Sequence, residues 1–161
     1  MAEQENKPIG LDNVGHRILT DAVMEMMDQF SDISGQEIRF NDINETGICF
    51  SNDTGSLILS EKANILGGYE RRCSYPFFVI YRLARRDEKQ MLAANEFLER
   101  LGCWISGDPL GDEPVKIPTL SDGRKITNIS RSVPYPTEPT QDGMQDWILP
   151  VVVEYEHIKE F

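Results

Sequence analysis

The strongest constraint on the fold is the segment of residues 69–83, in which apolar side chains recur at every second position. Its odd-numbered positions are Tyr69, Arg71, Cys73, Tyr75, Phe77, Val79, Tyr81 and Leu83. Side chains of a strand point alternately to opposite faces, so this pattern predicts one long strand with a nearly continuous apolar face. Pro76 has no backbone N–H to donate, and it is therefore expected at a bulge or at an edge position without a ladder partner.

Two segments with helical periodicity flank this strand. The first covers about residues 11–30, and its apolar stripe consists of Leu11, Val14, Ile18, Ala22, Met26 and Phe30, widened by Leu19, Val23 and Met27. The second covers about residues 87–105, with Met91, Ala94, Leu98, Leu101 and Ile105, widened by Phe97 and Trp104. Steps of three and four residues place these side chains on one helix face, which predicts two amphipathic helices. Asp12 or Asn13 is expected to cap the first helix, and Asp87 the second.

Shorter strands complete the pattern. They are predicted at about residues 37–40, 47–50, 56–59, 124–133 and 147–155. Residues 106–118 and 134–143 are rich in Pro and Gly and predict exposed, projecting loops. This order of elements predicts an α+β fold, a mainly antiparallel β-sheet with two α-helices packed on one face. The length of 161 residues suits a single domain over residues 1–161, in which residues 1–10 form a flexible N-terminus.

The charge balance excludes some classes of function. The chain has 16 Lys plus Arg against 27 Asp plus Glu, a formal net charge of -11. Specific nucleic-acid binding needs clustered positive charge, so it is not expected. No apolar run reaches the ~18 residues of a transmembrane helix, and the polar N-terminus does not resemble a signal peptide. A soluble, intracellular protein without a membrane partner is expected.

The residue types that most often bind metals or act as nucleophiles are few and dispersed. Cys49, Cys73 and Cys103 are odd in number and each lies in apolar sequence, which predicts buried, reduced thiols rather than disulfides or a zinc site. His16 lies beside the first helical stripe, and His157 is expected in a frayed C-terminal tail. Neither has an acid or a Cys at ligand spacing, so both are interpreted as structural or solvated. No catalytic, cofactor-binding or metal site is predicted, and no cofactor.

Three weaker patterns have simpler explanations. Five residues match positions of a calcium-loop template, namely Asp42, Asn44, Thr46, Gly47 and Asp53. Position 9 of that template is the apolar Phe50 and the flanks predict strands, so a polar turn is the better interpretation. A further group of carboxylates, Asp108, Asp112 and Glu113, lies among Gly and Pro and is interpreted as a solvated acidic loop. The third pattern is a group of basic residues, namely Arg71, Arg72, Arg82, Arg85 and Arg86. Neighbouring strand positions face opposite sides, so Arg71 and Arg72 do not form one basic patch. Because Arg is favoured at interfaces, these residues are interpreted as surface or subunit-interface arginines.

Four stretches of the chain resemble one protein family. They are ILGGYERRCSYPFFVIYR at residues 65–82, ANEFLERLGCWI at residues 94–105, PTLSDGRKI at residues 118–126 and MQDWILPVVVEY at residues 144–155. Together they resemble the tail-terminator and minor capsid proteins of tailed bacteriophages, over about residues 55–157. The shared features are structural patterns rather than catalytic signatures.

The resemblance implies a virion structural protein without catalytic residues. Family members are α+β subunits of a hexameric ring at the head-proximal end of the tail, where the ring caps the tail tube and joins it to the head. The implied partners are further copies of the chain, the tail-tube protein and a head-completion or connector protein, with DNA passing through the ring. The implied location is the virion tail, after synthesis in the host bacterial cytoplasm. An acidic subunit suits a ring through which DNA must slide.

Other functions remain as alternatives. The first is another head–tail joining or minor capsid component with a similar fold, and a cellular binding module is a second. The third is a small enzyme such as an acyltransferase, which would need a catalytic His with an acid at a fixed spacing. After His16 that position is Thr20, with Asp21 one residue further on, so the enzyme is disfavoured.

Overall fold

The structure is a computed structural model that describes residues 8–30, 39–40, 47–83, 88–108, 113–141 and 143–160. Two long strands form its centre. These strands are β5 (Tyr69–Leu83) and β8 (Gln145–Lys159), and they pair antiparallel along their whole length, from Tyr69 opposite Lys159 to Leu83 opposite Gln145. The long strand predicted from alternation is therefore confirmed at both of its ends.

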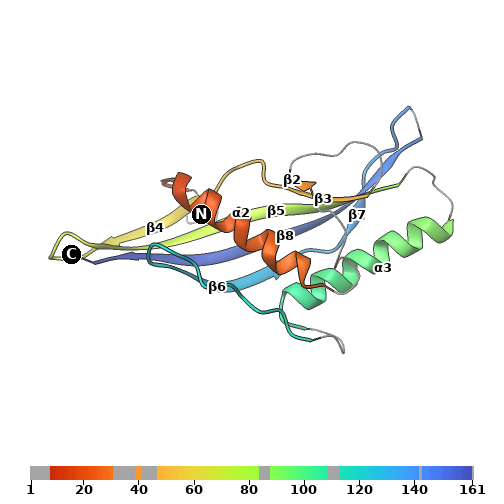
Figure 1. The fold of residues 1–161 in the computed structure, drawn as a ribbon. Coiled ribbons are helices and arrows are strands. Elements are labelled where there is room, and N and C mark those ends of the chain that lie inside the picture. The colour runs from red at the N-terminus through yellow and green to blue at the C-terminus, as the bar shows by residue number, and fades with distance from the viewer. Residues whose placement is uncertain are drawn as a thin grey trace.

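Six shorter strands extend this pair into one eight-stranded sheet (Figure 1). On the edge of β5 away from β8, two strands pair with successive parts of β5, namely β4 (Leu57–Ala63) and β3 (Gly47–Ser51). Beyond them, β1 (Gly10–Leu11) pairs with β4, and β2 (Arg39–Phe40) pairs with β3. On the free side of β8 lie β6 (Arg124–Arg131) and β7 (Tyr135–Pro136). All pairings are antiparallel except that of β2 with β3. Together with the two helices of the described residues, this confirms the predicted α+β class.

Pro76 lies where the neighbours of β5 change. The pairing of β3 ends at Phe78 and the pairing of β4 begins at Ser74, so Pro76 has a strand partner only on the β8 side. Its carbonyl points into the gap and accepts a hydrogen bond from Asn52 Nδ2 at 2.7 Å. The N–H and C=O of a strand residue point to the same side, so the missing N–H costs no ladder bond. Pro76 is therefore paired with Val152 on one side and unpaired on the other, in the gap between β3 and β4 rather than at a bulge or on an edge strand.

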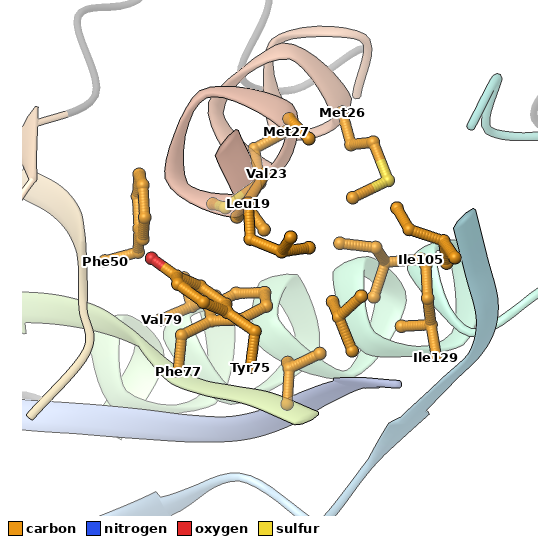
Figure 2. Packing of buried hydrophobic residues seen from close by; sticks show 14 of the residues in the cluster. Leu19, Val23, Met26, Met27, Phe50, Tyr75, Phe77, Val79, Ile105 and Ile129 are labelled. Atoms are coloured by element: carbon orange, nitrogen blue, oxygen red, sulfur yellow. The ribbon is translucent and has the colours of Figure 1, made fainter. Parts of the chain in front are cut away.

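Both helices, α2 (Asn13–Asp28) and α3 (Glu88–Ile105), lie on one face of the sheet (Figure 1). Odd-numbered residues of β5 and β8 point toward them, and Figure 2 shows Tyr75, Phe77 and Val79 beneath Leu19 and Val23 of α2. The residues of this core that are 0% exposed include Leu98 and Leu101 from α3 and Leu149 and Val153 from β8. Aromatic contact joins the helix ends, since the rings of Phe30 and Trp104 lie 5.1 Å apart.

The start of the first helical stripe differs from the prediction. Leu11 and Val14 are 57% and 60% exposed, whereas the stripe is buried from Leu19 onward. The reason is that the helix begins only at Asn13, with Asp12 turned inward as its cap and Leu11 in β1. Because Ile9 and Gly10 pair with β4, the expected flexible N-terminus does not include them; residues 1–7 lie outside the described part.

The two predicted loops are more structured than expected. Residues 134–143 include β7, which pairs with β8 in a hairpin, extended by a bond from Thr137 N–H to Asp146 O at 2.8 Å. The described end of the other loop is held against both helices. The side chain of Gln29 exchanges two hydrogen bonds with the backbone of Lys116, and Trp104 Nε1 donates to Glu113 O at 2.7 Å. Hairpin pairing and side-chain anchors, which composition does not reveal, explain both corrections.

Candidate functional site

A buried cluster of polar side chains joins the start of α2 to β6 and β8. Asp12 caps the helix, because its Oδ1 accepts a hydrogen bond from the backbone N–H of Gly15 at 3.0 Å. Arg124 binds both oxygens of the same carboxylate, with Nη2 2.7 Å from Oδ1 and Nε 2.9 Å from Oδ2. The hydroxyl of Tyr155 donates to Oδ2 at 2.7 Å and also contacts the hydroxyl of Ser56. The cluster therefore connects residues from both ends of the chain.

The surroundings of this cluster hold its groups in unreactive protonation states. Burial alone would raise the pKa of Asp12, but hydrogen bonds from Arg124, Tyr155 and the Gly15 backbone outweigh it and lower this pKa to about 2. Burial raises the pKa of the Tyr155 hydroxyl above its usual value, and it raises the pKa of the nearby Cys73 thiol to about 11. At neutral pH the carboxylate is ionised while the phenol and thiol are protonated. The cluster thus stabilises the fold and supplies no activated nucleophile.

Gly15 is part of this arrangement through its missing side chain. A Cβ at this position would overlap the Asp12 carboxylate and lie 2.7 Å from the Tyr155 hydroxyl. Only glycine lets the first turn of α2 approach the two side chains so closely.

The structure places the two histidines on α2 and β8. His157 is not in a frayed tail but in β8, where it is 5% exposed and its ring lies 5.3 Å from that of Tyr69. The expectation was wrong because β8 continues to Lys159 and pairs with β5 and β6 there. Burial and the charge of Arg124 lower the pKa of His157. His16 is half-buried on α2, with its ring 5.7 Å from that of Tyr75.

The cysteines are all free thiols. Cys49 and Cys73 are buried as predicted, but Cys103 is only half-buried and accepts a hydrogen bond from Arg131 Nη2 at 3.0 Å. Among the described residues, no group of three or more His, Cys, Asp or Glu side chains is placed to hold a metal ion.

The charged residues singled out in the sequence do not converge on one site. Arg82 forms a double hydrogen bond with Asp146, at 2.6 and 2.9 Å, while Arg71 pairs with Glu61 at 2.8 Å near the other end of β5. Arg72 is exposed on the opposite sheet face, as alternation predicts. Arg85 and Arg86 lie outside the described residues.

The acidic groups are solvent-exposed where the structure describes them. Asp108 and Glu113 are exposed, and Asp53 lies in an exposed turn, where it accepts a hydrogen bond from Ser51 Oγ at 3.1 Å. Three residues of the calcium template, Asp42, Asn44 and Thr46, and also Asp112, lie outside the described residues, while Gly47 begins β3.

The sheet has a second face, on which neither helix lies (Figure 1). Its centre is formed by three cross-strand pairs of half-exposed apolar residues, Pro76 with Val152, Phe78 with Pro150 and Ile80 with Ile148. We call these six residues the open apolar face. Charged residues border it at both ends, with Arg72 opposite Glu156 at one and Arg82 opposite Asp146 at the other. An apolar centre with a charged rim is typical of protein–protein interfaces.

A second exposed apolar feature is the turn between β4 and β5, which projects at one end of the molecule (Figure 1). Ile65 is fully exposed and Leu66 is 77% exposed. The side chain of Asn64 holds the turn, since its Oδ1 accepts hydrogen bonds from the N–H groups of Leu66 and Gly68 at 3.0 and 2.8 Å. Gly67 has a φ of 91°, which a side chain would disfavour. We call residues 64–68 the apolar tip.

Comparisons with known proteins include a structural likeness over most of the chain. No protein-family model and no curated protein matches the chain. A solved chain from the virion of a native gene transfer agent (GTA) particle has a similar fold, with a TM-score of 0.53 and 13% sequence identity. The similarity covers 91% of this chain and 99% of that chain, so the whole architecture is shared rather than one motif. At this identity, the likeness concerns the fold.

No helix in the described part of the chain combines the length and apolar character that crossing a bilayer requires.

Proposed function

We propose that the protein is a structural component of a phage-type virion, and specifically a tail terminator. In this role copies of the chain form a hexameric ring that caps the tail tube at its head-proximal end and joins it to the head. The observation that carries the proposal is the fold shared with a chain of the GTA virion over 91% of this chain. The sequence resemblance to tail terminators over about residues 55–157 supports the finer assignment.

The described surfaces suit a subunit that works by contact. The open apolar face and the apolar tip offer two different exposed apolar surfaces, as a ring subunit that contacts its two neighbours through unlike surfaces needs. The buried Asp12–Arg124–Tyr155 cluster has a structural explanation and does not favour a reaction. We therefore propose an assembly role without catalysis, with the tail-tube protein and a head-completion or connector protein as partners. The protein would be made in the host bacterial cytoplasm and reside in the virion.

The decisive test is removal of the gene from the phage or particle-producing strain, followed by electron microscopy of the products. A tail terminator predicts tubes of uncontrolled length that are not joined to heads, because both stopping and joining depend on the ring. Another head–tail joining component predicts separate heads and tails of normal length, which would replace the finer assignment. Normal joined particles would contradict a virion role altogether.

The hairpin around β7 and the loop before β6 are the proposed projecting contacts. Shortening residues 138–143 to a two-residue turn should leave the fold intact, because the change lies beyond the pairing of β7 with β8 and beyond the bond from Thr137 to Asp146. It should abolish tail completion or head joining, measured as infectious or transducing titre. An unchanged titre would show that this hairpin makes no essential contact.

A further inference from the structure

We propose that the apolar tip of one copy docks onto the open apolar face of the next copy, so that the ring is built from head-to-tail contacts. The inference rests on the proposed ring function and identifies the two surfaces that meet in it.

The first argument is that the tip presents its apolar side chains at a fixed position. Ile65 and Leu66 project from a turn closed by the bond from Asn64 N–H to Gly68 O at 3.0 Å, in addition to the bonds accepted by the Asn64 side chain. A turn held in this way loses little conformational entropy on binding, so less of the free energy gained by burying its apolar side chains is lost to ordering the turn. Two adjacent large apolar residues on such a turn form a small, defined projection.

The second argument is that the tip cannot reach the open apolar face of its own subunit. The tip follows β4 and precedes β5, and Phe78 lies eleven positions after Gly67 along the turn and β5. At ~3.3 Å per residue in a strand, the two features lie about 35 Å apart along the same rigid sheet. Contact between them therefore needs two molecules. Because the two surfaces differ, the contact is heterologous, and such a contact gives a closed ring when its rotation steps add up to a full turn.

The third argument is charge complementarity. The arm that carries the tip, residues 59–72, contains three basic residues and two acidic ones, although the whole chain has 16 basic against 27 acidic. Beyond that arm, the charged residues of β5 and β8 that share the open face are Asp146, Glu154 and Glu156 of β8 and Arg82 of β5, a net of two negative charges. A less acidic arm on an acidic strand lowers the repulsion between copies that a net charge of -11 otherwise imposes.

Cysteine cross-linking in assembled particles tests this contact. Ile65→Cys and Ile148→Cys are introduced singly and together into a Cys103→Ala background, since Cys49 and Cys73 are buried. Purified particles are treated with a short bis-maleimide and separated by denaturing electrophoresis. The double variant should give a ladder of multiples of 18.3 kDa, and each single variant only the monomer band.

Several outcomes overturn the inference. A ladder from Ile65→Cys alone would mean that two tips meet, and a cross-link from Ile65→Cys to a different virion protein would mean that the tip docks elsewhere. No ladder from the double variant, in particles that contain the protein and have normal tails, would also exclude the contact while leaving the proposed function intact. Absence of the protein from purified tails would instead contradict the proposed function.

A charge substitution provides an independent measurement. Ile65→Asp should keep the circular dichroism and melting temperature of the wild type, because the side chain is fully exposed. Since position 65 then carries the new charge, the cross-linking cysteine is moved to position 66, and the pair is Leu66→Cys with Ile148→Cys. Adding Ile65→Asp to this pair should abolish the ladder that the pair gives by itself. The matched control is Leu92→Asp, which changes a 61% exposed residue on α3 and should leave the ladder unchanged. A normal ladder with Ile65→Asp would contradict docking through the tip.

Discussion

The two faces of the sheet are built by the same strands but are finished differently. On the helix-covered face, Tyr75 and Val79 of β5 and Leu149 of β8 are 0% exposed, and the adjacent cluster around Asp12 satisfies its charges internally. On the other face, the equally apolar Phe78 and Ile80 stay half-exposed. Alternation along one strand thus builds a core that the chain completes and a surface that it leaves open. The difference separates residues that stabilise the subunit from residues available for assembly.

The largest effect should come from opening the charge cluster on the covered side. Arg124→Met leaves the buried Asp12 carboxylate without its cation, and loss of one partner of a buried ion pair typically costs about 3–5 kcal/mol. Urea unfolding followed by circular dichroism measures this loss. The control is Arg71→Met, which breaks the more exposed pair with Glu61 and should cost less than about 1 kcal/mol. Equal losses of unfolding free energy in the two variants would show that the buried cluster stabilises the fold no more than an exposed ion pair does.

Truncation within the covered core should come next. Leu98 is 0% exposed and faces the sheet from α3, so Leu98→Ala should lower the free energy of unfolding by about 2–5 kcal/mol. Leu92 lies on the same helix and is 61% exposed, and Leu92→Ala should change stability by about 0.5 kcal/mol or less. Equal losses at the two sites would mean that the buried side of α3 is wrongly assigned.

Acid should weaken the covered side in a defined window. The pKa of Asp12 is lowered from its ordinary 3.8 to about 2 in the fold. Its contribution to stability is therefore complete above pH ~5 and is lost as the pH falls through ~4 toward ~2, a loss of about 2 kcal/mol. Unfolding free energies at pH 5 and pH 2.5 should differ by less in Asp12→Asn than in the wild type. The same pH dependence in both proteins would contradict the assignment.

The sharpest comparison uses one substitution at two neighbouring positions of β8. Val151 points to the helices and is 1% exposed, so Val151→Thr buries a hydroxyl and should cost about 1–3 kcal/mol. Val152 lies on the open apolar face, and Val152→Thr should cost the subunit about 0.5 kcal/mol or less. We expect Val152→Thr to act instead on particle yield, since it makes the proposed docking face more polar. A larger stability loss at Val152 than at Val151 would reverse the assignment of the two faces.

Local patterns predicted most of the elements and little of what connects them. The strand at residues 69–83 was predicted at both ends because apolar residues alternate throughout it. The closing strand was predicted too short because polar residues such as Asp146 and Glu156 mark its ends, although each pairs in register with β5. The Asp12 cluster was missed, apart from the cap, because its partners lie 112 and 143 residues away in the sequence. Neither the open apolar face nor the apolar tip follows from periodicity, which does not reveal what covers a surface.

The bonds from Asp12 to Arg124 and Tyr155 also have a consequence for the order of folding. The cap of the first helix is completed by residues of β6 and β8, and the central pairing of β5 with β8 likewise joins the middle of the chain to its last strand. Such distant contacts slow folding, because a long loop must close before any stabilising contact forms. The open apolar face exists only once β8 lies beside β5. A subunit in which β8 has not yet paired therefore lacks one of the two surfaces of the proposed contact, so the proposed ring can close only through subunits whose own core is complete.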